Sequence, residues 1–319
     1  MPLPSHGAPL RAPHLAPHLS IAALALAGAL PGPAAAQPAA TPSTVVVTGN
    51  PLGSALATPS SVLAGDGLAL RRGGTLGETL DGLPGVAASA FGPQSSRPVI
   101  RGLDGDRIRL LDNGGASADA SNLSFDHAVA VDPLVVERLE VLRGPAALLY
   151  GGNATGGVVN AIDNRIPRSP LASLGGRAEL RLGGAASERA AAAVLEAGAG
   201  GLNWHADLAR RLSDNLRTPG FTRPGETTRS SRVANSDGDS TSAAVGASWA
   251  DAQGHAGAAV DGYRNNYGVT VDPEVRIRMQ RDRLQLGGER RGLAGPFASV
   301  ALQASHTRYQ HQEVEGDGA

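Results

Sequence analysis

The sequence contains no cysteine among its 319 residues. This absence excludes disulfides, thiolate zinc sites and cysteine nucleophiles. Lysine is also absent, so every basic side chain is arginine, and the formal net charge is only -1. A chain with so little net charge has no electrostatic footprint for nucleic acid. Its apolar runs stay shorter than the roughly 20 residues of a membrane-spanning helix, which excludes such a helix from the mature chain.

The N-terminus has the pattern of an exported protein. Residues 1–36 combine Arg11, an apolar run over 19–30 and a small-residue stretch ending at Ala36, which together predict a secretory signal peptide. A stretch rich in Pro, Ala, Thr and Ser follows and predicts a flexible arm within 37–60. This arm contains one β-branched segment that favours an extended backbone and could add to the edge of another protein's sheet: Thr44, Val45, Val46, Val47 and Thr48.

A small α+β domain is predicted over 61–167. Its central stretch, 136–162, reads as two short strands separated by a connector rich in glycine, which allows positive φ angles and close backbone approach. Upstream, 76–80 reads as a short helix, and 98–102 and 108–111 read as strands.

Several motifs of this domain resemble, in order, the signature of the plug domain of TonB-dependent outer-membrane receptors. They read L-P-G-V at 83–86, I-R-G at 100–102, R-L-E-V-L-R-G-P at 138–145 and G-G-V-V-N at 156–160. The resemblance implies that residues 44–48 are the TonB box, through which TonB supplies energy. It also implies a location in the outer membrane of a Gram-negative cell, and import of a scarce nutrient.

Alternating segments predict the start of a β-barrel over 168–319. Trp204, Ala206 and Leu208 alternate with more polar neighbours, as expected for strands facing lipid on one side and water on the other. A soluble antiparallel sandwich has the same period with its faces reversed, and an aromatic content of 3% is low for a membrane barrel. Seven segments are predicted: 177–184, 189–198, 202–212, 239–250, 255–266, 275–287 and 297–309.

The sixth of these segments loses its alternation around 281–283. The spacing of the segments predicts short connections on the periplasmic side of the strands and longer ones, 213–238 and 267–274, on the outer side. A barrel that holds a plug of this size needs about 22 strands, which the residues after 167 cannot supply. The sequence therefore predicts the first strands of a truncated transmembrane barrel.

No enzyme signature is found. The glycines at 152–157 lack the Lys and Ser or Thr of a phosphate loop, and neither H-E-x-x-H nor G-x-S-x-G occurs. We therefore expect neither an enzyme nor a bound cofactor. An outer-membrane adhesin or structural barrel remains an alternative from another class, although it would need neither the 44–48 segment nor a plug.

Asp126 and His127 are the candidate metal-binding residues. Carboxylate and imidazole are both good zinc ligands, although an adjacent Asp-His pair is also common as a simple loop hydrogen bond. The segment 119–128 resembles the plug loop of the zinc-uptake branch of these receptors, with Phe125 in place of Pro, and that resemblance implies zinc as cargo. The 213–238 connection lacks the histidines that this branch can carry there. His306, His311 and Glu313 are further candidate ligands near the outer end of the seventh segment.

The sequence thus predicts a TonB-dependent receptor that imports a metal, with zinc as first choice, or a metal complex. Its expected partners are TonB, the lipid of the outer membrane and the metal. A ferric siderophore, haem or vitamin receptor is the alternative within the same class.

Overall fold

The computed structural model describes residues 60–316 apart from 90 and 224. The predicted signal peptide 1–36 and the segment 44–48 lie outside the described residues. Among the residues described, no helix combines the length and apolar character needed to span a membrane.

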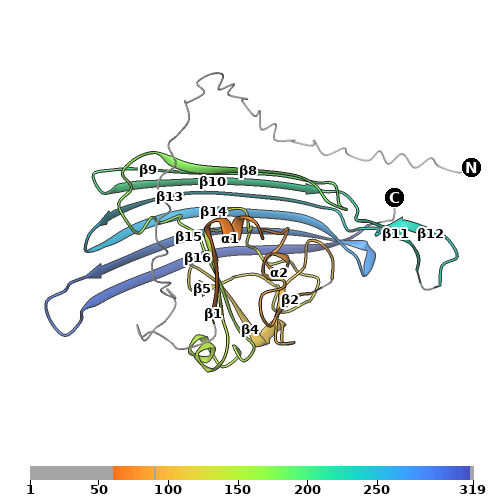
Figure 1. The fold of residues 1–319 in the computed structure, drawn as a ribbon, viewed down its shortest axis with the longest axis horizontal. Helices are drawn as coiled ribbons and strands as arrows, with labels where there is room; N and C mark the ends of the chain where they lie inside the picture. Colours follow the sequence, from red (N-terminus) through yellow and green to blue (C-terminus); the bar gives the residue numbers. More distant parts are fainter. Residues whose placement is uncertain (1–59, 90, 224, 317–319) are drawn as a thin grey trace, which may run out of the picture. The chain divides into compact units, whose positions relative to one another are not determined.

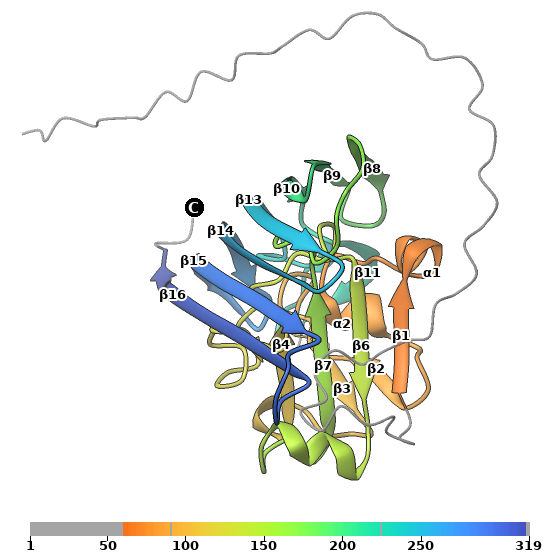
Figure 2. The ribbon, with the colours of Figure 1, turned by 90° about the vertical axis from the view of Figure 1, so that its left-hand side faces the viewer.

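The N-terminal part is built on a five-stranded sheet, which we call the small sheet. Its strands lie in the order β1 (Ser60–Ala64), β6 (Arg138–Leu142), β7 (Gly157–Ile162), β4 (Ile108–Asp112) and β5 (Gly115–Ala116). Figure 2 shows β1, β6, β7 and β4 side by side. The β4 and β7 strands pair parallel and the other neighbours pair antiparallel. This sheet confirms the strands predicted on both sides of the glycine-rich connector.

Short elements surround the small sheet. They are α1 (Gly65–Ala69), α2 (Leu76–Leu80), the hairpin strands β2 (Val86–Ala88) and β3 (Pro98–Ile100), and the 3-10 helices η1 (Gly105–Arg107) and η2 (Pro145–Tyr150). The α2 helix matches its prediction, and Thr75 caps it by accepting a hydrogen bond from the Glu78 amide at 3.2 Å. The η2 helix shows that the connector between β6 and β7 is partly helical, and Gly144 enters it with φ of 90°.

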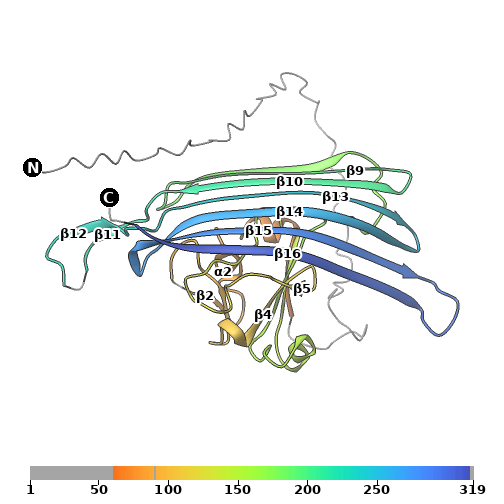
Figure 3. The ribbon, with the colours of Figure 1, turned by 180° about the vertical axis from the view of Figure 1, so that it is seen from behind.

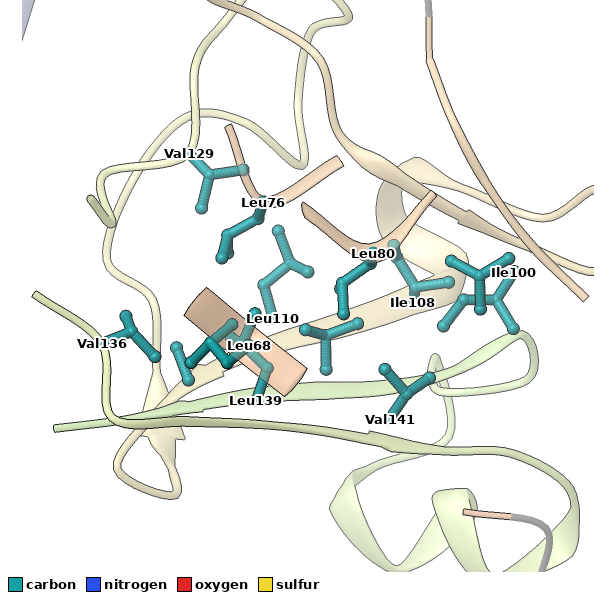
Figure 4. Packing of buried hydrophobic residues seen from close by; sticks show 13 residues of the cluster. Leu68, Leu76, Leu80, Ile100, Ile108, Leu110, Val129, Val136, Leu139 and Val141 are labelled. Carbon is teal, nitrogen blue, oxygen red and sulfur yellow. The ribbon is translucent and has the colours of Figure 1, made fainter. Parts of the chain in front are cut away.

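One apolar core lies between these helices and the sheet. Leu68 of α1 and Leu80 of α2 are fully buried beside Leu139 of β6 (Figure 4). Each such leucine stabilises the fold by about 1.5–3 kcal/mol relative to an exposed one. The core therefore fixes β6 and β4. Because β5 directly follows β4, both ends of the long loop between β5 and β6, which carries the candidate site, are fixed as well.

The C-terminal part is a seven-stranded antiparallel sheet, which we call the large sheet (Figure 1). Its strands are β8 (Gly175–Gly183), β9 (Glu188–Ala199), β10 (Leu202–Ser213), β13 (Gly238–Asp251), β14 (Gly254–Val269), β15 (Asp272–Arg291) and β16 (Ser299–Glu315). Each strand pairs with the next one along the chain, and the order runs from β16 at one edge to β8 at the other. All seven predicted segments are confirmed.

The two faces of the large sheet differ in polarity. On β10 the side chains of Trp204 and Leu208 are 56% and 55% exposed, whereas the alternate residues Asn203, His205 and Asp207 are buried. The polar face is the one that contacts the segment following β7, since Asp207 pairs with Arg165 and Asn203 accepts from the Leu171 amide. A sandwich would bury the apolar face, so this burial pattern supports the barrel interpretation over the soluble alternative.

Two details differ from the sequence prediction. The prediction that alternation is lost around 281–283 is wrong. Strand β15 continues through this stretch, with Arg281 and Arg283 buried and Asp282 half-buried. The charges of Arg281 and Arg283 suggested solvent-facing positions, whereas both side chains lie on the buried face of the strand. The connection predicted at 267–274 shortens to residues 270–271, since β14 and β15 are longer than expected.

The 213–238 connection contains a hairpin of its own. Strands β11 (Arg217–Thr222) and β12 (Arg229–Arg232) pair antiparallel between β10 and β13. Figure 3 shows this hairpin following the end of β10. Sequence alternation did not reveal it, because its residues are mostly polar on both faces.

Candidate metal site between the β5–β6 loop and β16

Asp119 organises the loop that joins β5 to β6. One carboxylate oxygen, Oδ1, accepts hydrogen bonds from the amide and the hydroxyl of Ser121, and the other, Oδ2, accepts one from the Ala130 amide at 3.1 Å. The two ends of the stretch from Ser121 to Ala130 are thereby held by one side chain. Burial raises the pKa of Asp119, although these hydrogen bonds and the charge of Arg281 act to lower it.

Arg97 supports the same loop from the β3 side. Its buried guanidinium donates to the carbonyl oxygens of Ser121 and Ser124 and lies 5.1 Å from the ring centroid of Phe125. That ring in turn stacks on Phe91 with centroids 5.0 Å apart. Phe125 thus has a packing role beside the candidate site.

Asp126 fixes the orientation and tautomer of the His127 ring. Its Oδ1 atom accepts from the Ser124 hydroxyl and lies 3.0 Å from Nδ1 of His127. An ionised carboxylate can only accept, so Nδ1 carries a proton, and in the neutral ring Nε2 keeps its lone pair. Burial raises the pKa of Asp126, but the hydrogen bonds from Ser124 and His127 outweigh it, and the net pKa is lowered.

Tyr267 of β14 holds the backbone on both sides of His127. Its hydroxyl donates to the Asp126 carbonyl oxygen at 3.0 Å and accepts from the Ala128 amide at 2.8 Å. The side chain is 1% exposed. Because both adjoining peptide groups bond to one buried phenol, the large sheet determines where His127 points.

His127 meets two residues of β16. Its Nε2 atom is buried, has no hydrogen-bond partner among the described residues and lies 3.5 Å from Oε1 of Glu313. The His311 ring lies edge-on to the His127 ring, with centroids 4.6 Å apart. One ligand atom from each of His127, His311 and Glu313 falls within 4.8 Å of the other two. Two imidazoles and a carboxylate at this spacing can hold a divalent metal ion.

The predicted site residues therefore separate into groups. His127, His311 and Glu313 come together, and Asp126 contacts the opposite nitrogen of His127. His306 does not join them, because it is an odd number of residues from His311 and therefore lies on the other face of β16, opposite Leu284 in the strand register. Tyr267 was missed, since nothing in the sequence connects it to residue 127.

A buried charge network ties the end of the small domain to the large sheet. Arg165 makes a bidentate contact to Asp207, at 2.8 and 3.1 Å, and lies 3.2 Å from Asp261. Arg283 bridges Asp261 and Asp112, each within 2.8 Å. Burial lowers the pKa of Arg165, but Asp163, Asp207 and Asp261 raise it overall. Charges placed at alternate positions of β10 and β15 were the available sequence signal.

Residues 54–158 match the TonB-dependent Receptor Plug Domain family. The chain is 32% identical over 126 residues to a vitamin B12 transporter, BtuB, of Vibrio vulnificus, and 31% identical over 118 residues to a hemin receptor of Yersinia pestis. These matches support the TonB-dependent receptor family. They cover 37% and 36% of this chain but only 20% and 17% of the relatives.

Solved structures extend the likeness from the plug domain to the large sheet. The copper transporter OprC superimposes with a TM-score of 0.65 at 18% identity, over 79% of this chain and 37% of that one. The siderophore receptor PirA from Pseudomonas aeruginosa gives 0.58 at 20% identity, over 80% and 41%. The fold is thus a plug domain followed by antiparallel strands that match part of a TonB-dependent receptor barrel. The relatives are transporters and receptors, which agrees with the expectation of no enzyme.

Proposed function

We propose that this protein is a TonB-dependent receptor of the outer membrane that imports a metal ion, with zinc as the cargo. The observation that carries the cargo assignment is the buried Nε2 atom of His127, which has no hydrogen-bond partner among the described residues and lies 3.5 Å from Oε1 of Glu313, with the His311 ring edge-on to the His127 ring. A buried imidazole nitrogen without a partner is costly in a folded protein, and a metal ion would satisfy it.

The three ligand atoms suit zinc in number and type. Zinc takes imidazole nitrogen and carboxylate oxygen at about 2.0–2.2 Å in tetrahedral geometry, so its ligand atoms lie about 3.3 Å apart. The His127–Glu313 distance of 3.5 Å is already close to that value. Three protein ligands leave one position for water or for a group that arrives with the metal.

Asp126 has a supporting role in this proposal. Metal-binding histidines commonly donate their second ring N–H to a carboxylate, which fixes the ring and raises its basicity. Asp126 and His127 have that arrangement, at 3.0 Å. The sequence prediction that both residues are direct ligands is thereby refined to one ligand and one orienting carboxylate.

The site joins plug and barrel. His127 belongs to the plug loop and His311 and Glu313 to β16, so movement of the plug separates the ligands. We infer that force applied by TonB through residues 44–48 releases the metal in this way.

Zinc titration by calorimetry tests the site. His127→Ala and His311→Ala should each weaken zinc binding by orders of magnitude, whereas His306→Ala, on the other face of the same strand, should leave it unchanged. Equal affinities for all three variants would reject the metal site.

Uptake tests the transport step separately. Deletion of 44–48 should abolish zinc accumulation by cells while calorimetric binding persists, whereas an adhesin would keep its function. Copper is the second candidate cargo, because imidazole also suits copper and OprC is a copper transporter. Copper binds most such sites more tightly than zinc, so competitive uptake rather than affinity must separate the two. A vitamin or siderophore cargo would not need His311 as a metal ligand, whereas haem iron could use its imidazole.

A further inference from the structure

Acidic side chains gather at the ends of β15 and β16 that lie beside the candidate metal site. They are Asp272 and Glu274 at the start of β15, and Glu313 and Glu315 at the end of β16. All four are exposed. The Gly316 amide donates to the Glu274 carbonyl oxygen at 3.0 Å, so the two strand ends are held side by side. This end of the large sheet therefore presents several carboxylates to the solvent next to the metal site.

Arginine does not neutralise these carboxylates. Within the part of the chain that the structure describes, none of the four forms an ion pair with an arginine. Glu313 and Glu315 lie opposite apolar residues of β15 in the strand register. Arg276 and Arg278 occupy alternate positions of β15, which face the other side of the sheet, and Arg276 is already bound to an aspartate at 3.0 Å. The negative charge on the face of the metal site is thus uncompensated locally.

Glu315, Glu313 and His311 follow one another on a single face of β16. Residues two apart in a strand point to the same side and lie about 7 Å apart. Glu313 is already at the metal site, because its Oε1 atom lies 3.5 Å from Nε2 of His127. That nitrogen has no hydrogen-bond partner among the described residues, and the His127 residue is 4% exposed. A cation that approaches past Glu315 therefore meets Glu313 and then the two imidazoles.

We propose that the cargo reaches this site as a hydrated divalent cation, and that Glu315 and Glu274 attract it before His127 and His311 bind it. The two carboxylates act on the ion through its water shell and by charge alone, so they speed its entry without being ligands. An anionic chelate of the same metal is repelled by the same charges. This inference rests on the proposed metal site and specifies the chemical form of its cargo.

The expected size of the effect follows from Coulomb's law. One negative charge about 7 Å from a divalent cation in water raises the local concentration of the cation roughly sevenfold before screening. Added salt reduces this attraction, because the screening length is about 10 Å at 0.1 M ionic strength. Steering of this kind changes the association rate, whereas the direct ligands determine the dissociation rate.

Stopped-flow binding of zinc chloride to the detergent-solubilised protein, followed with a fluorescent zinc indicator, tests the proposal. Glu315→Gln should slow zinc association about threefold or more at low ionic strength, and E274Q/E315Q should slow it further, with unchanged dissociation rates. Glu313→Gln should instead speed dissociation. Glu289→Gln is the matched control, because it removes the same charge near the opposite end of β15 and should associate normally.

Two further measurements examine the role of charge directly. Raising the salt concentration should slow zinc association more in the wild type than in E274Q/E315Q, because the variant has less attraction to screen. Zinc supplied as its nitrilotriacetate complex, which carries a net negative charge, should associate about tenfold more slowly than hydrated zinc, or slower still.

Any of four results would overturn the proposal: an unchanged association rate in E274Q/E315Q, equal slowing in Glu289→Gln, equal salt dependence of wild type and variant, or association of the nitrilotriacetate complex as fast as that of hydrated zinc. Failure of the metal site itself would be seen separately, because His127→Ala would then leave the equilibrium zinc affinity unchanged. The carboxylates tested are exposed, so the variants should keep the melting temperature of the wild type.

Discussion

Replacement of Asp126 by Asn tests whether this residue orients His127 or binds the metal itself. The substitution keeps the side-chain shape, and its amide oxygen can still accept the proton on Nδ1 of His127 at the 3.0 Å separation seen here. What is lost is the negative charge that makes Nε2 more basic. Loss of such a supporting carboxylate typically weakens metal affinity 10–100-fold, or about 1.4–2.7 kcal/mol.

Calorimetric zinc titration should therefore place Asp126→Asn between the wild type and His127→Ala. Asp106→Asn is a suitable control, because Asp106 is an exposed aspartate of the plug domain in η1. A loss as large as that of His127→Ala would show that Asp126 is a direct ligand. An unchanged affinity would show that it has no supporting role. Either result would refute the reasoning from ring orientation.

Further predictions concern the residues that support the site. Tyr267→Phe leaves the Ala128 amide and the Asp126 carbonyl without their partner, so it should cost about 1–3 kcal/mol in unfolding free energy and also weaken zinc binding; unchanged values in both measurements would contradict the clamp. Arg165→Met leaves the buried Asp207 with His205 as its remaining charged partner, and should lower stability by about 1–3 kcal/mol in thermal or denaturant unfolding, whereas a neutral effect would contradict the network. The folded-state pKa of Asp126 is lowered, so its ionised form contributes stability above about pH 4, the unfolded value, and that contribution is lost as pH falls through the folded value. Metal-free wild type and Asp126→Asn should therefore converge in melting temperature at low pH and diverge above it; a constant difference would contradict this.

Local pattern was sufficient for the strands. Alternation along the chain predicted all seven strands of the large sheet, because a membrane-facing strand must present apolar and polar residues to opposite sides. The same rule failed around Arg281, since it cannot distinguish a charge facing a plug from a charge facing solvent. Polarity shows that the two faces differ, and only the packed structure shows what each one contacts.

The candidate site was likewise predicted in part from the sequence and completed only by the packed structure. Sequence reasoning selected Asp126 and His127 from one loop and proposed His306, His311 and Glu313 from a segment more than 170 residues away. It could not choose among the latter, because strand register had to be known before one face of β16 could be assigned to the plug. Tyr267 had no local signal at all, since its partners are backbone groups of a distant loop.

The sequence by itself determined the elements of this protein: a plug signature, alternating strands and a pair of residues with metal-binding chemistry. The tertiary structure decided which side chains meet, placing His127 against His311 and Glu313 and directing Asp126 to the opposite ring nitrogen. The reason is that hydrophobic periodicity and turn preferences act over a few residues. Contacts between a loop and a strand edge depend instead on the register of the whole sheet and on the packing of the core beneath the loop.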